Sequence, residues 1–118
     1  MRIISGSLKG KKINYLKNIS TRPLKDSVKE NIFNILKHSH FIDSKVEKAN
    51  ILDLYSGVGS FGIECLSRGA EKVTFVEKDK YAANILKENL VHLSLLNKSV
   101  IARDSVENFL NFIVKEKY

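Results

Sequence analysis

The chain has 118 residues, 43% of them hydrophobic and 28% charged, which suits one globular domain with its own core. A single cysteine, Cys65, excludes an internal disulfide framework, and no apolar run approaches the roughly 18 residues of a membrane span. The net charge of +7 lies at one end: residues 1–25 carry seven basic side chains and no acidic one, whereas the other 13 basic residues balance 13 acidic ones.

Apolar and basic side chains are interleaved in residues 2–5 and 11–16, which predicts the two short strands of a hairpin with Gly6 or Gly10 near its turn. The concentrated positive charge favours a polyanionic partner, because binding releases counterions from the polyanion. A solubilising tail is the alternative, but the apolar residues argue against a disordered arm.

A helix is predicted after Pro23, which keeps the preceding chain extended. The sequence from Ser27 to Glu30 is that of a capping box, and apolar residues recur at helical spacing through about Lys37. A polar connector follows, and no metal site is expected at His38 and His40 within it.

From residue 50 the chain alternates between strand and helix patterns. The predicted elements are strands at 51–55, 73–76 and 99–102, and helices at 60–68, from a cap at Asp79 to about 93, and after a capping signal at 104–107. This order predicts an α/β fold of parallel strands with right-handed crossovers, the first half of a doubly wound sheet.

The stretch "ILDLYSGVGSFGIECLSRG", residues 51–69, contains a G-x-G-x-x-G turn between a strand and a helix. Gly57 and Gly59 allow a sharp turn and a close approach to a ligand, and Gly62 allows helix and strand to pack closely. Glu77, twenty residues after Gly57, ends the second strand, where a carboxylate accepts hydrogen bonds from ribose hydroxyls. These features fit a nicotinamide dinucleotide and S-adenosylmethionine equally well.

Asp53 separates the two ligands. It lies four residues before Gly57, where its carboxylate would repel a diphosphate but favour the ammonium and sulfonium groups of S-adenosylmethionine. Asp104, just after the third strand, could accept a hydrogen bond from an adenine amino group. The alternatives are that Asp53 is a solvated strand-end acid and that Asp104 only caps a helix.

The segments "TRPLKDSVKENIFNIL", "ILDLYSGVGSFGIECLSRGAEKVTFVEKD" and "ARDSVENFL" resemble the bacterial RsmD-type methyltransferases, which methylate the N2 amine of a guanine in 16S ribosomal RNA. The resemblance implies a Rossmann-like class I fold that binds S-adenosylmethionine. It assigns Asp53, Gly57 and Gly59 to the methionine part of the cofactor, Glu77 to the ribose and Asp104 to the adenine. Where the family often has Phe-Ala, this chain has Tyr55-Ser56, and Ser56 is able to donate a hydrogen bond to the cofactor.

The same resemblance implies that ribosomal RNA or the small ribosomal subunit is the partner. Arg2, Lys9, Lys11 and Lys12 would contact RNA phosphates, and Arg22, in the family's "TRP" sequence, would lie near the cofactor or the RNA. A cytoplasmic protein, monomeric at full length and without a metal, is expected.

One departure concerns catalysis. Amino methyltransferases of this type carry a [DN]-P-P-[YF] loop that orients the target amine, whereas Pro23 is the single proline of this chain. We therefore expect an N-terminal portion: a basic segment at 1–24 and a cofactor-binding domain at 25–118 that stops before a fourth strand. The 118 residues would then hold no catalytic residue and transfer no methyl group, and the first strand would have an unpaired edge.

Three alternatives stay open. Within the same chemistry, the enzyme would methylate adenine N6 or cytosine N4 in another nucleic acid. Outside it, the chain would be an NAD-dependent oxidoreductase, which Asp53 and the basic N-terminus disfavour, or a non-catalytic RNA-binding module.

Overall fold

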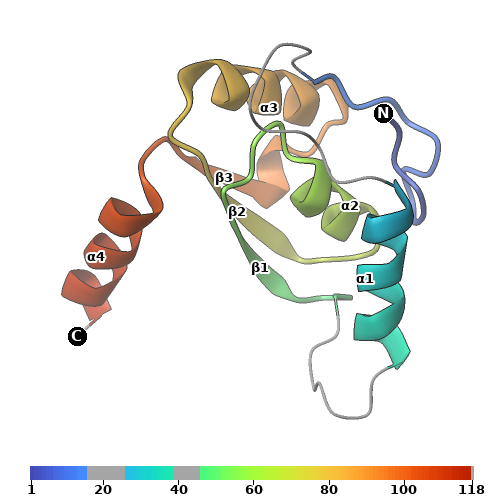
Figure 1. Cartoon of the computed structure of the whole chain (residues 1–118), viewed down its shortest axis with the longest axis horizontal. Helices are drawn as coiled ribbons and strands as arrows, with labels where there is room; N and C mark the ends of the chain where they lie inside the picture. The colour runs from blue at the N-terminus through green and yellow to red at the C-terminus, as the bar shows by residue number, and fades with distance from the viewer. Residues whose placement is uncertain (16–25, 39–45, 118) are drawn as a thin grey trace.

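The computed structural model describes residues 1–15, 26–38 and 46–117 (Figure 1). The elements are helix α1 (Asp26–His38), strand β1 (Asn50–Leu54), helix α2 (Ser60–Ser67), strand β2 (Lys72–Val76), helix α3 (Lys80–His92), the 3-10 turn η1 (Leu96–Lys98), strand β3 (Ser99–Ala102) and helix α4 (Val106–Lys117). None of the helices in these ranges is long and apolar enough to cross a membrane.

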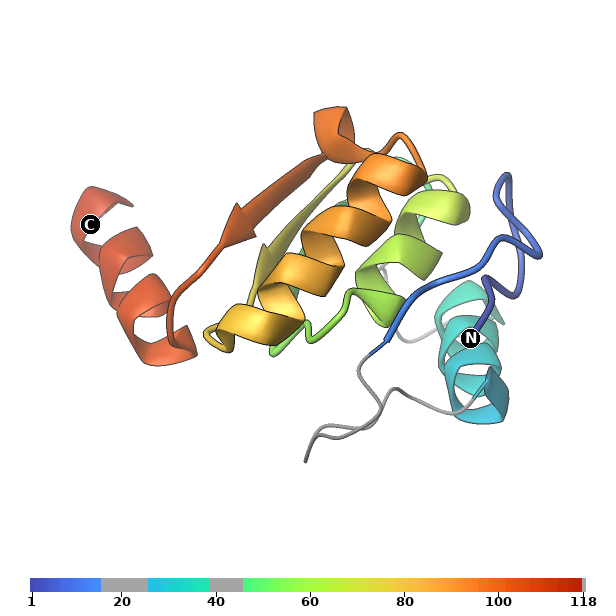
Figure 2. The same ribbon diagram turned by 90° about the horizontal axis from the view of Figure 1, so that it is seen from above.

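The three strands form one parallel sheet in the order β1-β2-β3. Helices α2 and α3 lie side by side on one face of this sheet, and α4 extends away from it on the side opposite α1 (Figures 1 and 2). The strand–helix alternation is thus confirmed, with most element bounds within a residue or two of those predicted. Among the described residues β1 pairs only with β2, so its other edge is open as expected.

Close packing of α2 on the sheet depends on Gly62. This residue is buried in the first turn of α2, and a Cβ at its position would overlap the ring of Phe75 and come within 2.9 Å of Val73 Cγ1. Both neighbours are fully buried residues of β2. The prediction that Gly62 allows helix and strand to approach closely is therefore confirmed.

Gly62→Ala is expected to lower the free energy of unfolding by about 2 kcal/mol, because the added methyl group forces Phe75 and Val73 to move in a packed core. Helix propensity alone would change stability in the opposite direction by about 1 kcal/mol. Urea unfolding checks the sign. A Gly62→Ala protein as stable as the unsubstituted one would show that the core accommodates the methyl group.

Residues 1–15, called the N-terminal segment below, belong to this folded core. Ile3 and Ile13 are almost completely buried in the same cluster as Ile63 and Leu90. The alternative of a solubilising tail is therefore wrong for these residues, whereas residues 16–25 lie outside the described part of the chain.

The predicted hairpin strands are wrong in detail. Arg2 and Lys12 form one isolated antiparallel bridge, flanked by hydrogen bonds from Ile3 N to Lys11 O and from Ile13 N to Met1 O, and no regular strand is present in residues 1–15. The ladder ends early because the next two amides, of residues 4 and 5, donate to a side chain of α2 instead of to a partner strand. The turn between the paired ends contains both predicted glycines, Gly6 and Gly10, with φ of 88° and 84°.

Two of the three capping predictions need correction. Asp79 caps α3 as predicted, since its carboxylate accepts a hydrogen bond from Ala82 N at 3.1 Å. In contrast, α1 begins at Asp26, which places Ser27 inside the helix. At α4 the capping acceptor is the hydroxyl of Ser105, which receives Asn108 N at 3.1 Å, and Asp104 lies one residue too early to fill that role.

Candidate functional site

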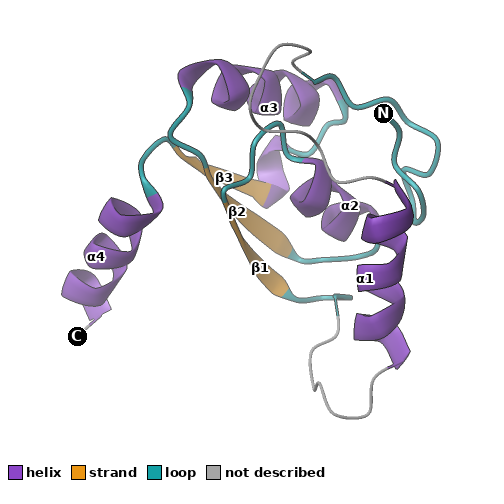
Figure 3. Cartoon of the chain, in the orientation of Figure 1, coloured by secondary structure: helices purple, strands orange, loops and turns teal. Residues whose placement is uncertain are grey.

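The glycine turn, residues 55–59, leads from the carboxyl end of β1 into α2 (Figure 3). Tyr55, Gly57 and Gly59 all have positive φ, of 57°, 57° and 97°, and the turn is closed by a hydrogen bond from Gly59 N to Ser56 O of 2.9 Å. A Cβ at Gly57 would meet no atom within 4 Å, so the backbone there borders open space. A Cβ at Gly59 would instead overlap the core side chain of Leu86, so Gly59 is required for internal packing as well as for its left-handed backbone conformation.

Glu77 directly follows β2, and its carboxylate holds the glycine turn in place. Its Oε1 accepts a hydrogen bond from Gly57 N at 2.8 Å, and its Oε2 accepts one from Asp79 N at 2.8 Å. The carboxylate is thus held between the turn and the start of α3. Each oxygen keeps a second lone pair for a ligand, because a carboxylate accepts about four hydrogen bonds.

Asp53 is the buried acid of the site. It is 8% exposed, and its Oδ2 accepts a hydrogen bond from Gly62 N at 3.1 Å. Burial raises the pKa of Asp53 from 3.8 to about 6; the Gly62 amide opposes this shift, and the charge of Glu77 adds to it. No cationic side chain among the described residues forms an ion pair with either acid. A cation would therefore be stabilised here, and a phosphate group would be repelled.

Ser56 supplies an unused polar group next to these acids. Its hydroxyl is buried and has no hydrogen-bond partner among the described residues. Buried polar atoms without a partner are rare, and they often mark a site that a ligand completes. Together, Ser56, the two carboxylates and the open backbone at Gly57 fit a ligand that carries both positive charge and hydrogen-bonding groups.

Asp104 lies apart from this group, in the exposed loop after β3. Its Oδ1 accepts hydrogen bonds from Ser105 N at 2.8 Å and from Asn108 Nδ2 at 3.1 Å, which orients the carboxylate at the start of α4. Because β3 is parallel to β1 and β2, Asp104 and Glu77 follow the same carboxyl edge of the sheet.

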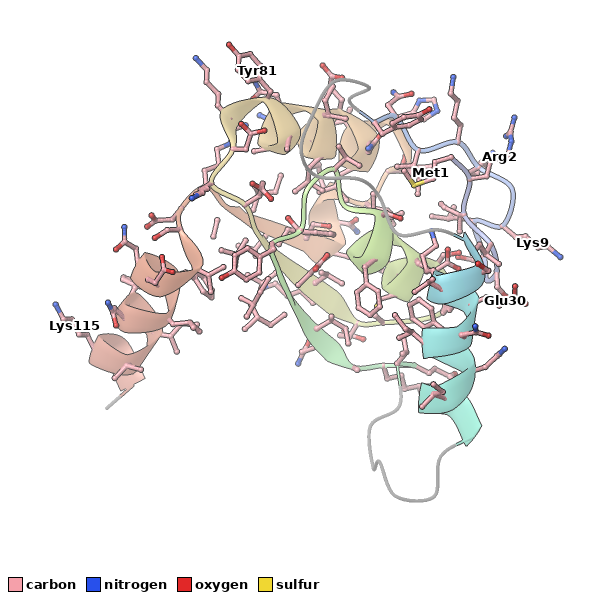
Figure 4. All side chains as sticks on the ribbon, in the orientation of Figure 1. Met1, Arg2, Lys9, Glu30, Tyr81 and Lys115 are labelled. Carbon is pink, nitrogen blue, oxygen red and sulfur yellow. The ribbon has the colours of Figure 1, made fainter. Side chains whose placement is uncertain are left out.

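The basic side chains of the N-terminal segment are exposed at Arg2, Lys9, Lys11 and Lys12. Figure 4 shows Arg2 and Lys9 projecting outward from the segment. The guanidinium of Arg2 also donates to Gly10 O at 2.8 Å, so it holds the turn as well as presenting charge. Arg22 and the rest of the TRP sequence lie outside the described residues.

Five buried polar residues were not predicted from the sequence: Lys29, Ser60, Glu64, Ser67 and Asn89. Glu64 and Ser67 hold the backbone of the N-terminal segment on α2. One signal was present: Glu64 is the single charged residue of the helix SFGIECLS.

Cys65 is buried, and its pKa is raised to about 12, mainly by burial and then by the charges of Asp53 and Glu64. Its thiol therefore stays protonated at neutral pH and is a packing group. In the described ranges, no three His, Cys, Asp or Glu side chains are grouped so that they could hold a metal ion.

Comparisons with known proteins identify the family of this chain. The family described as "Conserved hypothetical protein 95" matches residues 1–118. The ribosomal RNA small subunit methyltransferase D of Haemophilus influenzae is 44% identical over 90 residues, which cover 76% of this chain and 44% of that protein. The enzyme of the same name from Escherichia coli K12 is 33% identical over 101 residues, covering 86% of this chain and 48% of that protein.

Solved structures of other proteins share the fold of this chain. A hypothetical protein from Thermus thermophilus superimposes with a TM-score of 0.80 at 26% identity, over 98% of this chain and 62% of that one. A SAM-dependent methyltransferase from Agrobacterium tumefaciens, at 22% identity and a TM-score of 0.57 over 76% of this chain and 27% of that one, shares the fold. The predicted Rossmann-like methyltransferase fold is confirmed. The chain spans about half the length of the curated relatives it matches.

Proposed function

We propose, from the premise that the chain belongs to the "Conserved hypothetical protein 95" or RsmD family, that it is the cofactor-binding part of a ribosomal RNA methyltransferase. The proposed cofactor is S-adenosylmethionine, and the proposed substrate is small-subunit ribosomal RNA in the cytoplasm. The guanine N2 amine is the proposed methyl acceptor, on the strength of the family resemblance.

The observation that carries this proposal is the pair of carboxylates, Asp53 and Glu77, around a glycine turn that borders open space at Gly57. We assign Asp53, Ser56, Gly57 and Gly59 to the methionine part of the cofactor, Glu77 to the ribose and Asp104 to the adenine. When bound, S-adenosylmethionine supplies an electrophilic methyl group on a positively charged sulfur. The protein's contribution is to bind and orient that group: Asp53 stabilises positive charge, and Glu77 keeps the turn in place through Gly57 N.

Titration with S-adenosylhomocysteine and with NAD distinguishes the two enzyme classes. S-adenosylhomocysteine carries the ammonium and ribose but no phosphate, so it is expected to bind with micromolar affinity, whereas NAD is expected to bind at least about 100-fold more weakly because Asp53 repels its diphosphate. Isothermal titration calorimetry measures both. Tighter binding of NAD would favour the oxidoreductase and refute the proposal.

RNA binding by the N-terminal segment is tested through its salt dependence. Replacing Lys9, Lys11 and Lys12 with Gln is expected to weaken binding to deproteinised 16S ribosomal RNA and to reduce the slope of log K against log salt by about 2, since each phosphate contact contributes about 0.7. The matched control replaces three exposed lysines elsewhere, Lys72, Lys87 and Lys98. Equal slopes for both variants would show that the positive charge acts without a defined binding site.

Catalysis forms a separate part of the proposal. The [DN]-P-P-[YF] sequence that the resemblance implies is not among the 118 residues, which contain a single proline. We therefore propose that these residues bind the cofactor and RNA without transferring the methyl group by themselves. Transfer of labelled methyl to 16S ribosomal RNA by the purified 118-residue chain would contradict this part and leave the cofactor assignment intact.

A further inference from the structure

Asn89, on α3, bonds to two parts of the molecule that lie far apart in the sequence. Its Oδ1 accepts a hydrogen bond from Asn14 N at 2.9 Å, and its Nδ2 donates to Asn14 O at 2.9 Å and to Val58 O at 3.1 Å. Asn89 is 1% exposed, so solvent cannot replace these partners. Asn14 belongs to the N-terminal segment and Val58 to the glycine turn, and one side chain therefore joins the two.

A second polar bridge joins the same two parts at the other end of the segment. The ammonium of Lys29, which is fully buried, donates to the hydroxyl of Ser60 at 3.1 Å and lies 3.4 Å from Glu64 Oε1. Glu64 in turn accepts hydrogen bonds from Ile4 N and Ser5 N. Ser60 directly follows the glycine turn, so this end of the segment is linked to the turn indirectly, through Glu64 and Lys29. Figures 1 and 2 show the segment running beside α2.

We infer that Asn89 is a positioning residue through which docking of the N-terminal segment and the conformation of the glycine turn stabilise each other. If the segment leaves α3, Asn89 loses two of its three hydrogen bonds, and its hold on Val58 O is weakened. A ligand that binds the glycine turn in the conformation described here, with Val58 O bonded to Asn89, therefore favours the docked segment. By thermodynamic linkage, a ligand that binds the docked segment favours this conformation of the turn to the same extent.

This inference rests on the proposed function, because it assigns the two ligands: an S-adenosyl compound at the turn and RNA on the basic segment. It predicts that each strengthens the binding of the other. Asn89 bonds to backbone groups of Asn14 and Val58 and to none of the side chains assigned to either ligand.

Calorimetric titration of S-adenosylhomocysteine, with and without saturating 16S ribosomal RNA, measures the coupling. We expect RNA to tighten binding about fivefold or more in the unsubstituted protein, at the lower end of typical coupling between sites. Asn89→Ala is expected to reduce this factor to about 1 and to weaken binding of S-adenosylhomocysteine alone by about tenfold, because Val58 O and both Asn14 backbone groups lose their partner. Asn84→Ala, the same change at an exposed position of α3, is the matched control and should retain the full factor.

A second measurement uses the unsubstituted protein and does not depend on the stability of a variant. Hydrogen exchange at Asn14 N–H, which donates to Asn89, should slow when S-adenosylhomocysteine binds, although Asn14 lies in the N-terminal segment and not in the glycine turn. Failure of S-adenosylhomocysteine to bind at all would refute the proposed function. Binding without any effect of RNA, a full coupling factor in Asn89→Ala, or unchanged exchange at Asn14 would refute the positioning role alone.

Discussion

Glu64→Ala is expected to lower the free energy of unfolding by about 3–5 kcal/mol, the cost of removing one partner from a buried ion pair. Glu64 is fully buried and accepts hydrogen bonds from Arg68 Nε at 2.9 Å and from two backbone amides of the N-terminal segment. Its Oε1 also lies 3.4 Å from the ammonium of Lys29, which is itself 0% exposed. Alanine would leave that ammonium without its counter-charge and both amides without an acceptor.

Two further variants separate charge burial from general damage to the core. Glu88→Ala removes an exposed glutamate from a helix and is expected to change stability by less than about 0.5 kcal/mol. Combining Lys29→Met with Glu64→Leu removes both charges and should restore part of the loss, because paired buried charges are replaceable by apolar groups, whereas the amides of Ile4 and Ser5 still lack an acceptor. Urea unfolding at neutral pH measures all three. A Glu64→Ala protein within about 1 kcal/mol of the original would mean that water solvates the Lys29 ammonium in place of the carboxylate.

The parallel sheet and the turn were predictable because their signals are local. The strand at 99–102 and the cap at Asp79 follow from neighbouring residues alone, and both are confirmed. Asp53 was recognisable because it interrupts an apolar strand just before a glycine turn. Its hydrogen bond to Gly62 N was not predictable, because it depends on how closely α2 packs on β1.

The contacts of Glu64 and Asn89 could not be predicted from the sequence, because their partners lie about 60 and 75 residues away. A charged or amide side chain on a helix is usually solvated, and nothing in the helix pattern indicates that another segment covers it. The same contacts explain the error about the hairpin. Amides that were expected to pair with a second strand are instead satisfied by the Glu64 carboxylate.

Binding of S-adenosylhomocysteine is expected to tighten about tenfold between about pH 5 and pH 7, because its ammonium favours the ionised form of Asp53. Burial, partly opposed by the Gly62 amide and reinforced by Glu77, raises the pKa of Asp53 from 3.8 to about 6, so most of its ionisation in the folded protein falls in this range. Asp53→Asn should remove this pH dependence and weaken binding at neutral pH by about 30-fold or more, since a charge-assisted contact contributes roughly 2 kcal/mol.

The same ionisation has the opposite effect on the stability of the ligand-free fold. Because the folded-state pKa is raised, the folded protein holds the Asp53 proton more tightly than the unfolded chain. The contribution of Asp53 to the stability of the fold is therefore most favourable below about pH 4, and it becomes less favourable as the pH rises through about 6. The full cost above that range is about 3 kcal/mol, and Asp53→Asn should recover part of it at neutral pH, while its amide oxygen still accepts the bond from Gly62 N.

A variant that binds less tightly yet unfolds at higher urea concentration would show that Asp53 is retained for the ligand at the expense of the fold. Glu71→Gln, at an exposed acid, should change neither property. If Asp53→Asn instead loses stability and keeps its affinity, the carboxylate acts as a structural group and the cation site lies elsewhere.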